Sequence, residues 1–120
     1  MDKMIIQNIY NDIMELADKK NQEKLWLSRS QSNISSYSEL MCRLFDDNDF
    51  DDFLKTYALK IGLSTKLLKE LFDLQSKLNN YSGENNLSKI LNDPKWNEII
   101  QQAQLVVKLW KKEKHKFIFD

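Results

Sequence analysis

The chain is organised around one stretch, Leu44-Phe45-Asp46-Asp47-Asn48-Asp49-Phe50-Asp51-Asp52-Phe53-Leu54. Five carboxylates and no basic residue stand here among three phenylalanines and two leucines. Apolar side chains anchor such a segment to a core, whereas the aspartates must stay in water or find cationic partners. We therefore expect an acidic corner that is fixed to the core and supported by the rest of the chain.

The composition favours helices. A chain of 120 residues falls in the range of one domain, and its hydrophobic fraction of 42% is enough to fill a core. Glycine occurs twice and proline once, far less often than the turns of a sheet-rich fold require. The sequence predicts a single all-α domain over residues 1–120, a compact bundle of five or six amphipathic helices.

Charge and cysteine content exclude several classes of protein. The formal net charge is zero, which argues against a general nucleic-acid binder that depends on phosphate contacts. Residues 1–63 carry eleven acids and eight bases, and residues 64–120 carry seven acids and ten bases. The single cysteine, Cys42, excludes an internal disulfide and a zinc site built on cysteines. No apolar run approaches the roughly 20 residues of a membrane span, and the N-terminal pattern is not that of a signal peptide, so we expect a cytoplasmic protein.

The first half of the chain predicts three main helices. Apolar residues at helical spacing predict one over about residues 3–19, with a second short segment around Trp26 and a loop over residues 28–33. Ser36 and Glu39 have the spacing of a capping box, in which the hydroxyl accepts a backbone N–H and the glutamate reaches back. The helix that they start is expected to end near Asp46. Asn48 or Asp49 is the expected cap of the next helix, which Gly62 ends.

The second half predicts two longer helices and a short one. Ser64 is the expected N-cap of a helix that runs to about Leu78, and a short helical segment covers residues 87–91. Asp93 then precedes Pro94, which is the arrangement of a capping carboxylate before proline at the first helical position. The helix that follows carries Trp96 and Trp110, at a spacing that keeps both tryptophans on one face.

No motif in the sequence predicts catalysis or metal binding. The Asp47-x-Asp49-x-Asp51 pattern begins like a calcium loop, but Asp52 and Ala58 stand where an EF-hand needs glycine and a bidentate glutamate. The only histidine, His115, lies in a lysine-rich tail with no evident relation to these acids. Cys42 has no neighbouring histidine to activate it, so we expect a small buried hydrophobe. We therefore expect no enzyme, no cofactor, no metal and no small-molecule substrate.

Two interpretations of the acidic cluster stay open. Aspartates at a helix start are favoured by the helix dipole, which accounts for two or three of the five. The others repel one another unless they meet a basic partner. We assign Asp46, with Asp47 as its alternative, to a structural contact at the turn. Asp47, Asp49, Asp51 and Asp52 are the candidate partner-binding residues.

One run resembles a known family. From Ile34 to Asp47 the sequence has a Ser-Ser start, a glutamate and a helix that ends in Leu-Phe-Asp-Asp; a tryptophan segment precedes it, and Asp-Pro-x-Trp at residues 93–96 follows. This pattern is similar to that of small bacterial immunity proteins of polymorphic toxin systems, including contact-dependent growth inhibition. The resemblance covers about residues 25–110, although only the Ser-Ser-to-Asp-Asp run is specific. It departs from the family after Asp47, where further aspartates replace small residues.

The resemblance implies a cytosolic protein that neutralises a cognate toxin domain, often a nuclease, by covering its active site or substrate surface. A rigid acidic surface complements the basic cleft with which a nuclease holds phosphate, and such complementarity speeds encounter and sets specificity. Two alternatives stay open. The first alternative is a helical regulatory or scaffolding module. The second is a nucleic-acid binder that uses its C-terminal lysines.

Overall fold

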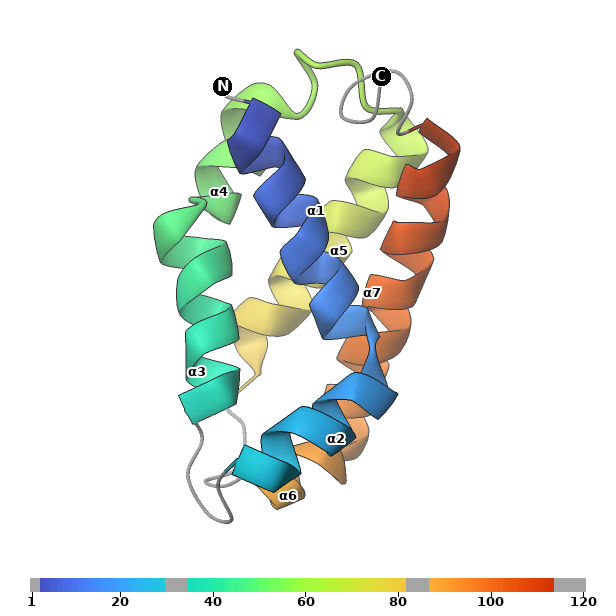
Figure 1. The fold of residues 1–120 in the computed structure, drawn as a ribbon. Helices are drawn as coiled ribbons and strands as arrows, with labels where there is room; N and C mark the ends of the chain where they lie inside the picture. The colour runs from blue at the N-terminus through green and yellow to red at the C-terminus, as the bar shows by residue number, and fades with distance from the viewer. Residues whose placement is uncertain (1–2, 30–34, 82–86, 114–120) are drawn as a thin grey trace.

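The described part of the chain is built from helices, as Figure 1 shows. The computed structural model describes residues 3–29, 35–81 and 87–113, and the side chains of residues 4–24, 37–81 and 87–113. In chain order the elements are α1 (Lys3–Ala17), α2 (Lys19–Arg29), α3 (Ser35–Met41), the π-helix η1 (Cys42–Asp47), α4 (Phe50–Asp52), the π-helix η2 (Phe53–Tyr57), α5 (Thr65–Asn80), α6 (Leu87–Leu91) and α7 (Pro94–Glu113). The predicted all-α class is confirmed. Because α3 continues into η1 and α4 into η2, the described residues form seven continuous helices, whereas the sequence predicts five or six.

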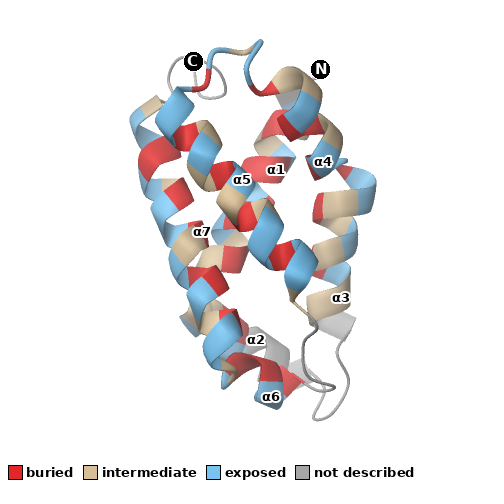
Figure 2. Ribbon diagram, turned by 180° about the vertical axis from the view of Figure 1, so that it is seen from behind, coloured by how far each residue is buried: buried red, intermediate tan, exposed pale blue. Residues whose placement is uncertain are grey.

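Helix α1 runs through the middle of the bundle. It packs along α7 on one side, and α3 with η1 lies on the other side of it (Figure 1). Helix α5 also packs on α7, while α2 and α6 lie together at one end. Ile9, Ile13 and Leu16 of α1 have no exposed surface, because their spacing of four and three residues places them on one helical face. In Figure 2 the buried residues of α5 and α7 recur along each helix between exposed ones.

Two buried tryptophans on α7 pack against aromatic side chains near the two ends of the core. Trp96 packs against Tyr37 and Tyr81, with both ring centroids 5.4 Å away. Trp110 packs edge-on against Tyr10 at 5.3 Å and is stacked with Phe53 at 6.3 Å. Both tryptophans are fully buried. The side chain of Trp26 lies outside the described residues.

The two π-helices lie on either side of a segment that contains the acidic turn, residues 48 and 49, and the short helix α4. The Asn48 N–H donates to the carbonyl of Arg43 over 2.9 Å, and the Ala58 N–H donates to that of Phe53 over 2.9 Å. Each bond spans five residues instead of the four of an α-helix, so each widens one turn and rotates the side chains that follow. In the short α4 between them, Phe50 lies in the core and Asp51 lies in solvent.

The start of α5 is tied to the end of α7. Gly62 takes a φ of 90°, where glycine has no steric cost, and the chain turns there as the sequence predicts. Ser64 caps α5 as expected, since its hydroxyl accepts the N–H of Leu67 over 3.1 Å. The Glu113 carboxylate in turn accepts the Ser64 N–H at 3.0 Å and the Ser64 hydroxyl at 2.6 Å.

Two expectations about the first half of the chain are wrong. Cys42 is exposed rather than buried. Leu40 and Leu44, two residues to either side of it, are fully buried, so Cys42 falls on the opposite face of the helix. Helix α2 includes residues 28 and 29 and therefore continues into the predicted loop, whose other residues, 30–33, lie outside the described part. None of the helices in the described ranges is long and apolar enough to cross a membrane.

Candidate functional site

The acidic turn between η1 and α4 is made by Asn48 and Asp49. Asn48 is only 7% exposed, and its amide donates to the Asp12 carboxylate of α1 over 2.8 Å. Asp49 has left-handed backbone angles, φ 49° and ψ 59°, and its carboxylate accepts the N–H of Asp52 at 3.4 Å. Beneath the turn, buried Phe50 meets Phe45 edge to face at 5.7 Å. A buried amide and an aromatic pair therefore hold the turn against the core.

The structure brings the four candidate partner-binding residues together at this turn. Asp47, Asp49 and Asp51 are exposed, and Asp52 is half-buried. The Asp52 carboxylate accepts the Thr56 hydroxyl at 3.1 Å, within the same continuous helix. Asp51 accepts a hydrogen bond from Gln75 of α5, which links the turn to a second helix. Asp49 and Asp52 thus stabilise their own helix, whereas Asp47 and Asp51 present carboxylates to solvent.

Asp46 does not take the structural role that the sequence suggests. Its side chain is exposed, and neither Asp46 nor Asp47 makes a side-chain hydrogen bond to any described residue. The two residues that follow, Asn48 and Asp49, make the structural contacts instead. Asn48 ties the turn to α1 and Asp49 caps α4, because the π-turn of η1 carries position 48 inward and leaves Asp46 and Asp47 outside.

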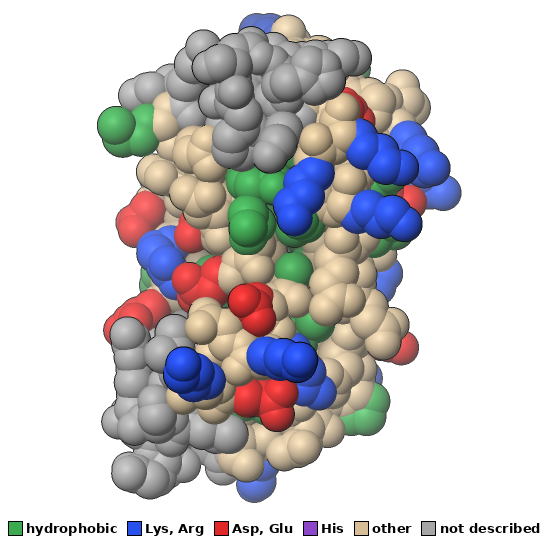
Figure 3. All heavy atoms as spheres, turned by 45° about the vertical axis from the view of Figure 1, so that its right-hand side comes forward, with side chains coloured by type: hydrophobic (Ala, Val, Ile, Leu, Met, Phe, Trp, Pro, Cys, Tyr) green, Lys and Arg blue, Asp and Glu red, His purple; other side chains and the backbone are tan. Residues whose placement is uncertain are grey.

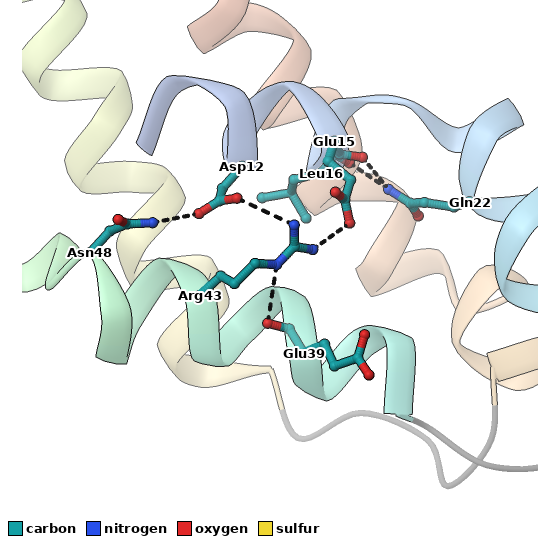
Figure 4. A network of polar contacts seen from close by, with 7 residues as sticks. All are labelled: Asp12, Glu15, Leu16, Gln22, Glu39, Arg43 and Asn48. Atoms are coloured by element: carbon teal, nitrogen blue, oxygen red, sulfur yellow. Dashed lines mark hydrogen bonds and ion pairs between the residues drawn. The ribbon is translucent and has the colours of Figure 1, made fainter. Parts of the chain in front are cut away.

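Behind the turn lies a network centred on Arg43 of η1 (Figure 4). One guanidinium nitrogen lies 2.8 Å from the Glu15 carboxylate, and another lies 3.7 Å from that of Asp12. The third donates to the backbone carbonyl of Glu39 at 3.5 Å. The network joins α1 to the continuous helix formed by α3 and η1. It gives Arg43 a fixed position under the acidic surface, by which we mean the exposed carboxylates of Asp46, Asp47 and Asp51.

Sequence reasoning missed this network. Its partners are 28 and 31 residues apart along the chain, beyond the reach of helical spacing rules. One signal was available, because Arg43 is the only basic residue between Arg29 and Lys55. A lone cation in so acidic a stretch is a candidate for a tertiary ion pair.

Burial dominates the electrostatics of Asp12. It raises the pKa of this carboxyl above the usual range, while the Arg43 charge and the Asn48 hydrogen bond act in the opposite direction. The charges of Glu15 and Asp47 add smaller upward shifts. The pKa of Arg43 is raised as well, chiefly by its hydrogen bond to Glu15. Arg43 is therefore surrounded by more negative charge than it neutralises.

The other predicted capping residues lie apart from this site. Ser36 is the second residue of α3, and its side chain lies outside the described residues. Glu39 has an exposed side chain. Asp93 precedes the first residue of α7; its carboxylate accepts the Lys95 N–H at 3.0 Å and the Tyr81 hydroxyl at 2.8 Å. The bond to the Lys95 N–H is the one expected of an N-cap. The bond to Tyr81 also connects this cap to an aromatic residue that packs against Trp96.

A different face carries an open groove of about 630 Å³. Its apolar lining comes from Met14 and Ala17 of α1 and from Val107 of α7, with charged residues of the α1–α2 junction around it. Figure 3 shows hydrophobic side chains exposed in the middle of this side of the molecule, with basic side chains gathered at the upper right. Among residues 3–29, 35–81 and 87–113 no group of three or more His, Cys, Asp or Glu side chains is placed to hold a metal ion.

Comparison with protein-family models, with curated proteins and with solved structures found no match to this chain.

Proposed function

We propose that this protein is an immunity protein, which binds a cognate toxin domain and neutralises it by covering a basic active site or substrate surface. A nuclease is the toxin class whose chemistry fits best. One observation carries the proposal: Asp46, Asp47 and Asp51, which lie on either side of the turn, are exposed and make no ion pair with any described residue. A nuclease must hold phosphate with basic side chains, and three fixed carboxylates complement such a surface.

The rigidity of the turn supports binding over a purely local folding role. Asp49 caps α4, Asp52 bonds within its own helical segment and Asp51 accepts a hydrogen bond from Gln75. Asp46 and Asp47 therefore add repulsion without a hydrogen bond to any described residue in return. The Asn48–Asp12 bond and the buried Phe50 fix the backbone that displays them. A surface that is already ordered loses less entropy when it binds.

An apolar side chain adjoins the acidic surface. Phe72 of α5 is 45% exposed and lies three residues before Gln75, on the same side of the helix. Gln75 donates to Asp51, so Phe72 lies close to the edge of the charged surface. Aromatic residues supply much of the affinity of protein interfaces, whereas charges mainly set rate and specificity. Phe72 is the candidate apolar anchor.

Protection in cells tests the proposal. We expect the chain to restore growth to bacteria that express a toxin domain encoded by a neighbouring gene. The variant Asp46→Asn/Asp47→Asn/Asp51→Asn should protect less well while remaining folded. The matched control is Glu23→Gln/Asp73→Asn/Glu98→Gln, which removes the same charge elsewhere and should protect like the wild type.

Two results would contradict this function. Loss of protection in both triple variants would show that total charge matters and the turn does not. Strong, salt-dependent retention of free RNA or DNA by the isolated protein, without toxin binding, would instead favour a nucleic-acid binder. Lys108, Lys111 and Lys112, all in the last turns of α7, are the residues that would serve it.

A further inference from the structure

A polar recess opens between α1 and the end of η1, next to the acidic surface. It has a volume of about 360 Å³ and is lined by side chains from both elements and from the turn: Asn8, Asn11, Asp12, Arg43, Asp47 and Asn48. Asp12 and Asn48 form its buried part, at 6% and 7% exposure, while Asn8, Asn11 and Asp47 stand at its rim. A small polar group that enters it would meet a preformed wall.

The charges around the recess are unbalanced. Asp12 and Asp47 line the recess together with Arg43, and the guanidinium of Arg43 is already paired with Glu15 and Asp12. Arg43 is already engaged by Glu15, by Asp12 and by a backbone carbonyl, so it has little left to offer an anion. Asp47 has no cation among the described residues. An anion entering the recess would be repelled, and a second cation would be attracted.

The hydrogen-bonding groups of the recess favour the same kind of ligand. The Asn48 amide must turn its nitrogen to the Asp12 carboxylate, which leaves its oxygen without a hydrogen bond to any described residue (Figure 4). The Asn8 side chain likewise makes no hydrogen bond within the described part of the chain. Amide and carboxylate oxygens are acceptors for the N–H groups of a guanidinium or an ammonium ion.

We propose that this recess binds one cationic side chain, an arginine or a lysine, of the partner protein. The inference rests on the proposed function, since it assigns to the acidic surface one defined position at which a basic residue of the toxin domain inserts. Asp47 pairs with the incoming charge, and the Asn8 and Asn48 amides orient it. The planar fork of arginine can use several acceptors at once, so arginine should bind more tightly than lysine.

A titration of the isolated, ¹⁵N-labelled full chain with a small probe tests the recess without the toxin. The probe is N-acetylarginine methylamide, and its neutral counterpart is N-acetylcitrulline methylamide. We expect the arginine probe to shift the side-chain amide signals of Asn8, Asn11 and Asn48 in a saturable way. Citrulline should leave these signals in place. Asp47→Asn should weaken binding by about threefold or more, the size of a partly exposed ion pair, whereas Asp73→Asn on α5 should not change it.

The inference is overturned if citrulline shifts the same signals as much as arginine. It is also overturned if Asp47→Asn binds the arginine probe as the wild type does. Probe binding in a protein that protects against no toxin would refute the proposed function and leave the recess standing. Protection without any probe binding would do the reverse, so the two failures are distinguishable.

Discussion

Asp49 combines a strained backbone with a capping role. Its φ of 49° lies in the left-handed region, which costs most residues other than glycine about 1–2 kcal/mol, although aspartate and asparagine tolerate it best. The same side chain accepts the N–H of Asp52, so it offsets part of that cost locally. The acidic surface is therefore built on a residue whose identity matters for folding, whatever it contributes to binding.

Substitutions at Asp49 separate these two roles. Asp49→Ala loses the cap and keeps the left-handed angles, so the free energy of unfolding should fall by about 1–2 kcal/mol. Asp49→Asn keeps a capping oxygen and tolerates the angles, so it should stay within about 0.5 kcal/mol of the wild type. Urea denaturation measures both. Equal destabilisation in the two variants would show that the charge of Asp49, and not its shape, stabilises the turn.

Asp12 should give stability an unusual pH dependence. Burial raises the pKa of this carboxyl in the folded protein, so protonation favours the folded state. The stabilising contribution of its protonated form is fully present below the unfolded-state pKa and is lost as the pH rises through the folded-state value. The wild type should therefore gain stability relative to Asp12→Asn as the pH falls from about 7 to about 4.

Urea denaturation of both proteins across this pH range tests the prediction for Asp12. The opposite trend, in which the wild type loses stability relative to Asp12→Asn on acidification, is that of a carboxylate stabilised mainly by its ion pair. It would show that Arg43 outweighs burial.

At the scale of elements, Gln22 joins three helices. It is fully buried in α2, and its amide nitrogen donates to the carbonyls of Glu15 and Leu16 at the end of α1, at 3.0 and 2.8 Å. Its amide oxygen accepts the indole N–H of Trp96 on α7 at 3.1 Å. The bend from α1 into α2, and with it the position of Glu15 beneath Arg43, depends on this side chain.

Gln22→Leu should be severely destabilising. It removes three hydrogen bonds that join the three helices, two to the carbonyls of Glu15 and Leu16 and one from the indole N–H of Trp96, so we expect a loss of about 2–4 kcal/mol by urea denaturation. Gln104→Leu is the matched control, because Gln104 also donates to a carbonyl at the end of α1, that of Ala17, but at an exposed site. It should cost less than about 1 kcal/mol. Similar losses in both variants would mean that Gln22 acts by local helix capping only.

The elements that sequence predicts well are those whose ends are decided locally. Ser64 and the Asp93-Pro94 pair mark the starts of α5 and α7 because a cap needs only its own first turn. The π-turns at 42–47 and 53–57 have no such local signal. The wider spacing of η1 places Asn48 in the core and leaves Asp46 in solvent.

The candidate site, too, is predictable from the sequence only in part. Its aspartates are visible in the sequence as a cluster, but the assignment of each carboxylate to a cap, to a neighbouring helix or to solvent depends on tertiary structure. The Arg43 network and the recess beside it require α1 and η1 to be adjacent, which no local pattern specifies.

At the scale of the whole molecule, charge is separated between two regions. Exposed aspartates occupy the η1–α4 turn, whereas Lys108, Lys111 and Lys112 lie at the end of α7, tied to the start of α5 through Glu113. The formal net charge of the chain is zero, yet these two regions carry opposite charge. The basic partner that we propose would be attracted to the first region and repelled from the second, which would orient it before contact.

The association rate with a toxin domain, the partner that we propose, tests the central claim most directly. It is measured by stopped flow at low salt and at about 0.5 M salt for the wild type, for Asp46→Asn/Asp47→Asn/Asp51→Asn and for the matched control Glu23→Gln/Asp73→Asn/Glu98→Gln. We predict that the turn variant associates about tenfold more slowly at low salt with little loss of stability, that the control stays close to the wild type, and that the difference nearly vanishes at high salt, where charges are screened. A turn variant that associates at the wild-type rate in low salt but melts at a much lower temperature would show instead that the aspartates are a folding device and that the binding surface lies elsewhere.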